Sequence, residues 1–411
     1  MLTRRHLLQN LGMGAGLCGL AGTVAGQAAA ASPLSARNSH HPIRAKRLIF
    51  LFMAGGPSHV DLFDPKPRLE EFDGKPAPFK LPNLERTPPG KIRKSPFTFR
   101  RYGESGIDVS EMFPHVARHV DDLCVIRSMV ADNINHNGAC LQMNTGEQTF
   151  SRPSMGSWLL YGLGTENQNL PGFVVVAPNQ PAQGAPLWDS SFLPAAYQGT
   201  CVTDLKQPIT NLANNSLDAN SQRRQLDLLA RLNRIHRNQS VSVDELDARI
   251  ASFELAFRMQ SAAPEAFDLS GESKITQELY GIDDTVTQTF GEQCLLARRL
   301  VERGVRFVQI FCGAENTTAR KIRPNWDSHE DLPRDHGYWG RVLDGGAAAL
   351  LKDLKARGLL DETLVICTTE FGRQPAAQGN RALGRDHNAD AFTAWFAGGG
   401  IKGGASVSAL A

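Results

Sequence analysis

The apolar residues of this chain fall into short continuous runs that end in turn-forming residues. The first run is RLIFLFM at Arg47–Met53, and Ala54-Gly55-Gly56-Pro57 follows it directly. A run of about four to eight apolar residues bounded by a glycine turn is typical of a strand buried in a parallel sheet. Five later runs have the same character and predict further strands: Leu123–Met129, Phe173–Val176, Val305–Phe311, Leu364–Cys367 and Phe392–Phe396.

Segments with helical periodicity separate these runs. Two of the segments end at Gly304 and Gly358, which are suitable helix stops. The predicted helices are Pro153–Leu163 with Ser154 as its cap, Val243–Met259, Gly291–Glu302 and Gly345–Arg357. Because strands and helices alternate, the pattern predicts an α/β fold with a mostly parallel sheet sandwiched by helices.

Two stretches fit neither pattern. Residues 65–106 are rich in Pro, Lys and Arg and predict a long excursion over the surface. Residues 177–240 are rich in Asn, Gln, Pro and Ser, and we interpret them as an insertion or a cap. We expect a single α/β domain over residues 47–411 that contains both stretches.

The amino-acid composition is that of a globular protein and does not indicate nucleic-acid binding. The 411 residues are 41 % hydrophobic and 21 % charged, as in ordinary globular proteins. Because 44 Lys and Arg nearly cancel 42 Asp and Glu, no electrostatic footprint for nucleic acid is present. Six cysteines beyond Cys18 are scattered without a CxxC pair, and Cys294, Cys312 and Cys367 lie in apolar patterns that predict buried thiols.

The amino terminus has the form of an export signal. Thr3-Arg4-Arg5 precedes a weakly apolar, Gly/Ala-rich run, and Ala28–Ala31 offers small-residue cleavage sites. Paired arginines favour the twin-arginine route, so we predict a signal peptide over residues 1–31 and a linker over residues 32–46. The run falls short of the ~20 apolar residues of a membrane span. We expect a periplasmic or secreted protein without a stable membrane span after cleavage; an uncleaved anchor is the alternative.

Polar and charged side chains follow the predicted strands. The densest group lies in IRPNWDSHEDLPRDHGYWG at residues 322–340, which looks like neither a core strand nor an amphipathic helix. Since ligands bind outside the carboxyl ends of parallel strands, a metal site is expected at this sheet edge; a solvated acidic loop is the alternative. The side chains that would converge there are His59, Asp61, His136, Asp327, His329, Glu370, Asp386 and His387.

Several motifs carry a family resemblance. The run ALLKDLKARGLLDETLVICTTEFGR resembles the carboxyl-terminal signature of the alkaline phosphatase and sulfatase superfamily. The runs RLIFLFMAGGPSHVDLFDPKP, MNTGEQTFSRPSMGSWLLYGLG and GRDHNADAFTAWFAGGGIKGG resemble a family of exported bacterial proteins of unknown function that is related to sulfatases. This resemblance covers nearly everything after the signal and implies an alkaline phosphatase/sulfatase-like α/β fold.

The resemblance also implies metal ligands. Asp327, His329 and His387 stand where the superfamily holds one metal ion, and Glu370 stands at a ligand position of a second ion. His136 occupies the place of the sulfatase nucleophile, counted from Gly146. It is interpreted as a nucleophile, a further metal ligand or a general acid.

The chain departs from the superfamily pattern in four places. His136 replaces the expected Cys, Ser or Thr, and Phe371 replaces a metal-binding His or Asn. The superfamily has an Asp after the first strand where this chain has Ala54-Gly55-Gly56, and His59 or Asp61 is expected to fill that role. After GGGIKGG the family continues through a strand and a helix, whereas this chain ends in ASVSALA, which predicts a truncated sheet edge.

These features lead to two functional hypotheses. The first is a metal-dependent hydrolase of sulfate or phosphate esters, with zinc or manganese favoured by the histidine-rich ligand set and one or two ions bound. Arg373 is the first candidate and Arg385 the second for binding the ester oxygens. The alternative is a non-catalytic surface or polysaccharide-binding protein on a degenerate sulfatase-like scaffold.

Overall fold

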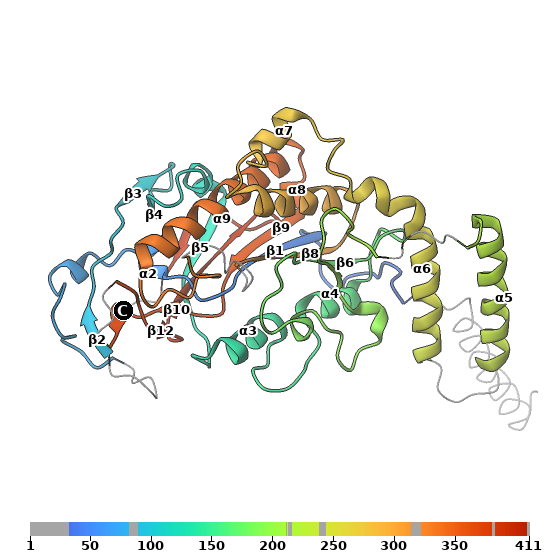
Figure 1. Ribbon diagram of the computed structural model, residues 1–411, viewed down its shortest axis with the longest axis horizontal. Helices are drawn as coiled ribbons and strands as arrows, with labels where there is room; N and C mark the ends of the chain where they lie inside the picture. The colour runs from blue at the N-terminus through green and yellow to red at the C-terminus, as the bar shows by residue number, and fades with distance from the viewer. Residues whose placement is uncertain are drawn as a thin grey trace, which may run out of the picture.

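An eight-stranded sheet forms the centre of the protein in the computed structural model, which describes residues 33–81, 89–210, 212, 216–237, 244–313, 322–379 and 383–408 (Figure 1). The predicted signal peptide lies outside these ranges. In order across the sheet, the strands are β14 (Ala405–Val407), β5 (Leu123–Met129), β13 (Phe392–Ala397), β9 (Thr363–Thr368), β1 (Arg47–Met53), β8 (Phe307–Cys312), β6 (Phe173–Val176) and β7 (Thr200–Val202).

Most neighbouring strands are parallel. Strand β1 runs parallel to β8 and β9, and β6 runs parallel to β7 and β8. Strand β13 is the exception, because it runs antiparallel to both β5 and β9. The mostly parallel α/β architecture predicted from the sequence is therefore confirmed, and every predicted strand is present with bounds that differ by no more than about two residues.

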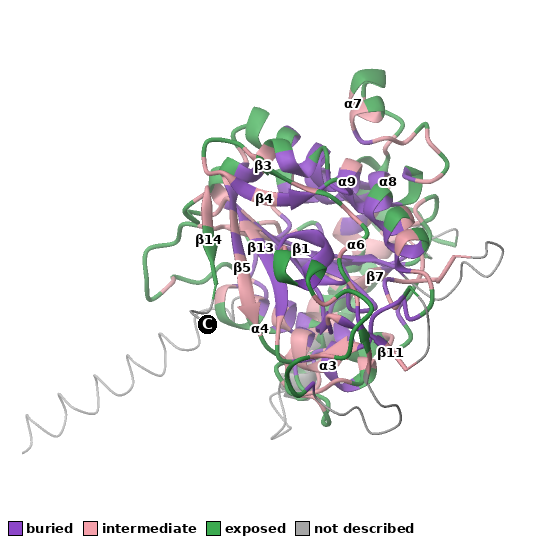
Figure 2. Ribbon diagram, turned by 90° about the vertical axis from the view of Figure 1, so that its left-hand side faces the viewer, coloured by how far each residue is buried: buried purple, intermediate pink, exposed green. Residues whose placement is uncertain are grey.

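Helices cover both faces of the sheet. In Figures 1 and 2, α8 and α9 lie on one side of it, and α3 and α4 lie on the other. The described helices are α2 (His59–Leu62), α3 (His136–Thr145), α4 (Met155–Leu163), α5 (Ala219–Arg237), α6 (Asp244–Phe267), α7 (Lys274–Leu279), α8 (Gln288–Glu302) and α9 (Leu332–Ala356), with short 3₁₀ turns at Pro67–Glu70, Val116–Asp122, Ala185–Leu187, Ala195–Tyr197 and Leu360–Glu362. No helix in the described ranges has both the length and the hydropathy to cross a bilayer.

The central strand explains why both faces need cover. Alternate side chains of β1 join different apolar clusters: Ile49 and Leu51 pack with residues of α8 and α9, while Phe50 and Phe52 pack toward α3 and α4. A strand buried on both faces must be apolar at every position, which accounts for the continuous run RLIFLFM. The buried sheet is visible at the centre of Figure 2.

Small sheets and an added strand lie outside the predicted pattern. Residues 65–106 contribute β2 (Pro89–Ile92), paired with β11 (Ala376–Gln378), and β3 (Phe99–Tyr102), paired with β4 (Ile107–Ser110). Residues 177–240 contribute β7 at one edge of the main sheet and then α5, which pairs with α6 beside the main body (Figure 1). At the other edge β14 pairs with β5.

Helix α9 begins earlier than the sequence predicts. The apolar periodicity begins at Gly345, and Asp335 and His336 were expected to start the helix ahead of it; the helix begins at Leu332 with Asp331 as its cap, so the second half of the segment 322–340 is helical. Asp335 and His336 take inward positions in these early turns and interrupt the apolar pattern there. Both side chains are fully buried.

A buried ion network ties α8 to α9. Arg298 on α8 is only 1 % exposed, and its guanidinium lies 2.7 Å from Glu272, 2.7 Å from Glu302 and 2.9 Å from Asp353 of α9. Replacing one member of a buried ion cluster leaves the remaining charges uncompensated. The network therefore fixes the helical layer behind β1 and β8.

We expect Arg298→Met to lower the free energy of unfolding by about 3–5 kcal/mol in urea titrations, because three carboxylates lose their shared cation. The control is Arg303→Met at the end of the same helix, where the partner Glu265 is 83 % exposed. That change is expected to cost less than about 1 kcal/mol. Equal losses in the two variants would contradict the assignment.

Candidate metal centre and adjoining cavity

The ends of several strands meet at one edge of the sheet. Strand register places Met53 opposite Cys312 and Phe52 opposite Thr368, so β1, β8 and β9 finish side by side. Strand β5 finishes at the same edge, because its last residue Met129 is paired with the first residue of the antiparallel β13. The segments that carry the predicted site residues therefore leave the sheet within one small region, as expected.

The glycine turn after β1 makes room for the next loop. Gly55 has φ of +112°, and a Cβ there would lie 2.6 Å from the backbone nitrogen of Asp327 and 2.7 Å from that of Trp326. Only glycine combines this backbone conformation with such a close approach. The glycine therefore lets the Asp327 loop pack directly against the turn after β1.

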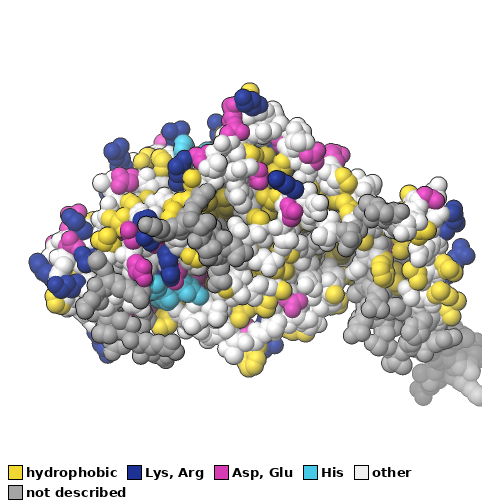
Figure 3. Space-filling model, viewed as in Figure 1, with side chains coloured by type: hydrophobic (Ala, Val, Ile, Leu, Met, Phe, Trp, Pro, Cys, Tyr) yellow, Lys and Arg dark blue, Asp and Glu magenta, His cyan; other side chains and the backbone are white. Residues whose placement is uncertain are grey.

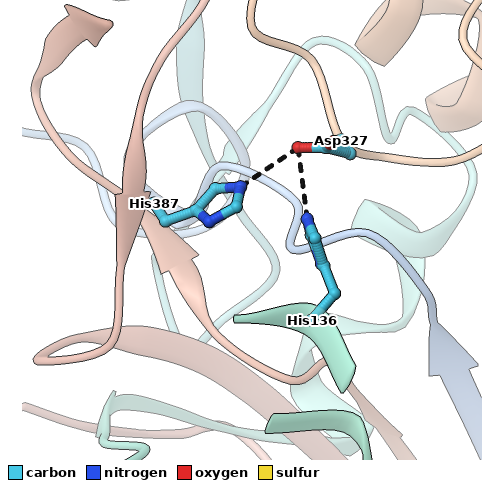
Figure 4. Close-up of side chains that lie close together, drawn as sticks. All are labelled: His136, Asp327 and His387. Atoms are coloured by element: carbon cyan, nitrogen blue, oxygen red, sulfur yellow. Dashed lines mark hydrogen bonds and ion pairs between the residues drawn. The ribbon is translucent and has the colours of Figure 1, made fainter. Parts of the chain in front are cut away.

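Three imidazoles converge on one carboxylate oxygen. Asp327 Oδ1 lies 3.3 Å from His136 Nε2, 2.8 Å from His329 Nε2 and 3.2 Å from His387 Nε2. His329 and His387 bring their Nε2 atoms within 3.0 Å of each other. His136, Asp327 and His387 form a group able to hold a metal ion, and Figure 4 shows their side chains directed at one another from separate elements.

Two of these imidazoles are oriented by acceptors on their outer side. His387 Nδ1 lies 2.7 Å from the carbonyl oxygen of Ile134, and His136 Nδ1 lies 2.8 Å from Glu370 Oε1. A carbonyl oxygen only accepts, so Nδ1 of His387 carries the proton and Nε2 presents a lone pair. Acceptors behind metal-binding imidazoles commonly fix the ring and its tautomer in this way.

The distances fit a tetrahedral ion. Ligand atoms about 2.0–2.1 Å from zinc lie about 3.3–3.4 Å from one another, and the His136 and His387 nitrogens lie 3.3 and 3.2 Å from Asp327 Oδ1. Within the described residues, His136 Nε2 is also buried without a hydrogen-bond partner. A cation between these atoms would satisfy every one of them.

Protonation of the cluster follows from its charges. Burial opposes protonation of His136, but the carboxylates of Asp327 and Glu370 outweigh it and raise its pKa to about 9. Burial and the cation of Arg373 lower the pKa of His387 to about 4, and burial also lowers the pKa of His329. Arg373 and the imidazoles overcome burial and hold the pKa of Asp327 far below its usual range.

Arg373 lies beneath the cluster rather than in an open site. Its side chain is 0 % exposed, and Nη2 lies 2.6 Å from Asp327 Oδ1. The remaining donors reach the carbonyl oxygens of Gly55, Gly56 and Arg385. The predicted role in binding ester oxygens does not match this placement, because the donors are already used; Arg373 instead neutralises and positions Asp327.

Glu370 and Phe371 occupy the region of the superfamily's second ion. Glu370 is buried, and its carboxylate accepts hydrogen bonds from the backbone N–H of Gly55 at 2.7 Å and from the hydroxyl of Thr369 at 2.8 Å, besides its contact with His136. The Phe371 ring lies 4.8 Å from the His136 ring and 4.6 Å from the His387 ring. Among the described residues, the group of three able to hold an ion is His136, Asp327 and His387, and Glu370 and Phe371 contact its imidazoles.

The structure places His59 and Asp61 in a neighbouring polar network. Asp61 accepts from Arg385 Nε at 2.6 Å and from the hydroxyl of Ser58, and it is fully buried. His59 Nδ1 lies 3.4 Å from the backbone nitrogen of Arg373. Among the described residues, the metal-binding group of three does not include either residue. They contact the arginines behind the cluster, and Arg385 donates to Asp61 through two of its three guanidinium nitrogens, Nε and Nη2.

The remaining acids of the segment 322–340 do not all face solvent. Asp335 accepts from the hydroxyl of Ser328 at 2.8 Å and from Arg334 at 2.8 Å, and it is 0 % exposed. His336 Nε2 accepts from the backbone N–H of Ser58 at 2.9 Å. Asp335 therefore lies in the first turn of α9, close to its expected place at the start of the next helix, and anchors the loop that carries Asp327.

A cavity of about 560 Å³ adjoins the cluster. His136, Asp327 and Glu370 reach it from the metal side, and Arg323 stands in its wall. Figure 3 shows histidine side chains at the surface left of centre, with basic and acidic side chains beside them. The other lining residues are small or amide-bearing: Ala54, Gly55, Asn135, Asn137, Cys140, Pro181, Ala182, Gln183, Gly313, Pro324 and Asn325.

Sequence reasoning missed Arg323. Its guanidinium contacts Asp327, and the residue lines the cavity. The sequence had instead favoured Arg373 and Arg385 as the arginines that bind ester oxygens. Its position in the sequence could have indicated a role, because Arg323 lies four residues before Asp327 in the segment 322–340, where a metal site was predicted. Cys140 was also missed; it lies one helical turn after His136 on α3 and lines the cavity.

The family of the chain can now be stated. The family described as "Protein of unknown function (DUF1501)" matches residues 45–410. The chain belongs to this family. The match confirms the expected membership of a family without an assigned function, and a search of curated proteins found no match.

Solved structures with a similar arrangement include an alkaline phosphatase, a sulfatase and a lipoteichoic acid synthase. The alkaline phosphatase of the Antarctic bacterium TAB5 aligns over 90 % of this chain and 95 % of its own, with 9 % identity and a TM-score of 0.37. The PsFucS1 sulfatase from Pseudoalteromonas sp. aligns over 88 % and 64 %, with 11 % identity and a TM-score of 0.35. The lipoteichoic acid synthase LtaP from Listeria monocytogenes aligns over 92 % and 73 %, with 9 % identity and a TM-score of 0.35. The fold of this family member is defined by its own sheet order, β14-β5-β13-β9-β1-β8-β6-β7.

In the metal-free protein, the pair of carboxylates around His136 should make stability depend on pH. The pKa of His136 is about 9 in the folded chain and exceeds the ordinary 6.5. The stabilisation of the folded chain by protonated His136 is therefore complete below pH 6.5 and is lost as pH rises through 9. We expect His136→Gln to remove on the order of 2–3 kcal/mol at low pH and little above pH 9, measured by urea unfolding with chelator.

The matched control is His119→Gln. Burial lowers the pKa of His119 below the ordinary 6.5, so this imidazole is neutral in both the folded and the unfolded chain from about pH 7.5 to 9, and its effect should stay constant there. A His136→Gln effect that is equally constant over this range would refute the charged pairing.

Proposed function

We propose that this protein is a metal-dependent hydrolase of sulfate or phosphate esters that acts outside the cytoplasm. It holds one divalent ion, zinc or manganese, between Asp327 and the imidazoles of His136, His329 and His387. The observation that carries the proposal is the convergence of three imidazole Nε2 atoms on Asp327 Oδ1, at 2.8 to 3.3 Å, beside a cavity. Nitrogen-rich donor sets of this kind favour transition metals over calcium or magnesium.

One ion is preferred over two because of the neighbours of Glu370. Its two carboxylate oxygens already accept three hydrogen bonds, from Gly55, His136 and Thr369. Phe371 provides no ligand atom, and its ring lies against Gly56, where a Cβ would come within 2.6 Å of it. Glu370 therefore acts by orienting His136 and stabilising its positive charge in the metal-free state.

In this proposal, the ion and the protein side chains have separate chemical roles. A divalent ion bound there would act as a Lewis acid toward the ester and lower the pKa of water. Asp327 and the imidazoles supply its ligands, and Arg373 fixes Asp327 from below. To hold an ion, His136 would present an unprotonated Nε2, and Glu370 would keep the proton on Nδ1.

Water is the proposed nucleophile. Of the described side chains that line the cavity, Cys140 is the only one with a hydroxyl or thiol group. Burial and the neighbouring Glu370 raise the pKa of Cys140 well above its usual value, so the thiol stays protonated. His136 serves in this proposal as a ligand rather than as a covalent nucleophile, because both of its nitrogens face carboxylates.

One observation favours the second candidate, a non-catalytic binding protein. The place of the sulfatase nucleophile holds His136, and the place of a second-ion ligand holds Phe371. A protein that binds a polysaccharide or another surface ligand through the same cavity would need neither group. The outcome of the metal and turnover measurements separates the two candidates.

Export through the twin-arginine route belongs to the proposal as well. It is supported by Arg4-Arg5 and by the apolar, small-residue run that follows. The route carries folded proteins, so an ion bound before export would be retained. This placement would bring the site to extracytoplasmic esters.

The test is the metal content of protein purified without chelator, followed by turnover of aryl sulfates and aryl phosphates. Wild-type protein is expected to hold about one zinc or manganese per chain. Asp327→Asn should weaken metal affinity by more than about 100-fold, because Asp327 is a direct ligand in the proposal. Mutation of a partner that only supports a ligand already weakens metal affinity by about 10- to 100-fold. Turnover should fall to background in this variant and after chelation.

The matched control is Asp331→Asn, four residues along the same segment. Asp331 caps α9 by accepting from the backbone of Arg334, a role that Asn also performs. Metal content and turnover should be unchanged in this variant. A folded wild-type protein without metal sinks the proposal, and metal without turnover of either ester class favours the binding protein.

A further inference from the structure

One edge of the Arg323 guanidinium, formed by Nε and Nη2, is hydrogen-bonded to Asp327. Its Nε donates to the backbone oxygen of Asp327 at 2.8 Å, and its Nη2 donates to Asp327 Oδ2 at 2.9 Å. A guanidinium has five N–H groups, so these two bonds leave the Nη1 and outer Nη2 hydrogens. Within the described ranges, no acceptor lies within hydrogen-bonding reach of Nη1, and the residue stands in the cavity wall with a side chain that is 40 % exposed.

The backbone of Arg323 is held as firmly as its inner edge. Its N–H donates to Asp335 Oδ1 at 3.2 Å, and its carbonyl oxygen accepts from Trp339 Nε1 at 3.0 Å. Both partners lie on α9 and are buried. A side chain fixed at its root and along one edge loses little further entropy when it binds a ligand.

The surroundings of Arg323 favour an anion. Asp327 and Glu370 are the carboxylates among the described lining residues, and each is already paired, with Arg373 and His136 respectively. The amino end of α3, a helix of ten residues, also forms part of the wall through Asn135 and His136. A helix amino terminus carries partial positive charge and favours anionic groups.

We propose that Arg323 binds the oxygens of the phosphate or sulfate group and thereby selects esters of tetrahedral oxyanions. The free Nη1 and Nη2 hydrogens form the fork that pairs with two such oxygens at once. Asp327 joins the two sites, since Oδ1 belongs to the metal centre and Oδ2 to the arginine. The assignment rests on the proposed function and replaces Arg373 and Arg385, whose guanidinium groups are buried.

The experiment measures the affinity of inorganic phosphate and sulfate for metal-loaded protein by calorimetry, with metal content determined on the same samples. Arg323→Met is expected to weaken binding by about 10- to 100-fold, the range of a charge-assisted hydrogen bond to an ion. Its metal content should stay near that of the wild type. Arg334→Met is the matched control, because Arg334 is similarly exposed at 38 % and pairs with Asp331 and Asp335, outside the cavity.

Arg323→Lys covers the case in which the Met variant does not fold. Lysine keeps the charge but cannot bond Asp327 and pair with two ligand oxygens together. A loss of several-fold in phosphate affinity with retained metal would support the proposal. Unchanged affinity in the folded Arg323 variants, or an equal loss in Arg334→Met, would overturn it, as would metal-loaded wild-type protein that binds neither anion.

Turnover separates this inference from the proposed function. Metal-loaded protein that binds phosphate through Arg323 but cleaves no ester supports the anion site and defeats the hydrolase. Ester cleavage with the same KM in wild type and Arg323→Met retains the hydrolase and overturns the role of Arg323.

Discussion

The ion pair between Asp327 and Arg373 is the contact on which the rest of the site depends. Arg373 is fully buried, and its donors reach Asp327 and the carbonyl oxygens of Gly55 and Gly56. A buried guanidinium is costly unless its hydrogen bonds are satisfied. The turn after β1 and the loop after β8 both contribute acceptors, so the pair locks two separate loops to each other and sets the direction of the Asp327 carboxylate.

The same pair gives the site a defined charge. Asp327 stays ionised because Arg373 and the imidazoles stabilise its negative charge more than burial opposes it. Arg373 also keeps His387 neutral, while Glu370 and Asp327 favour the proton on His136. In the metal-free chain that proton balances the carboxylates; a divalent ion would replace it between the same atoms. In the proposed site, proton and metal would compete for one position, which would couple metal occupancy to pH.

The sequence was sufficient for the sheet but only partly for the site. Continuous apolar runs such as Arg47–Met53 predict strands well, because burial on both faces leaves no other composition. Asp327, His329 and His387 were grouped correctly in space, since parallel strands bring their ends together. The orientation of Arg373 was beyond prediction: whether a guanidinium next to a site points inward or outward depends on acceptors elsewhere in the chain, here the carbonyl oxygens of a glycine turn. The same limit affects the exact start of α9, where buried polar residues interrupt the apolar pattern.

Phe371 packs an apolar ring into the middle of the polar site. Its ring rests on Gly56 and against the rings of His136 and His387, so it fills with apolar contacts the space beside Glu370. Glu370 is then left with hydrogen-bond partners from the protein alone and turns its charge toward His136. Glu370 thus orients the His136 ring, whose Nε2 lies 3.3 Å from Asp327 Oδ1. The packing of Phe371 and the contact between Glu370 and His136 therefore act together in setting the geometry of the His136, Asp327 and His387 group.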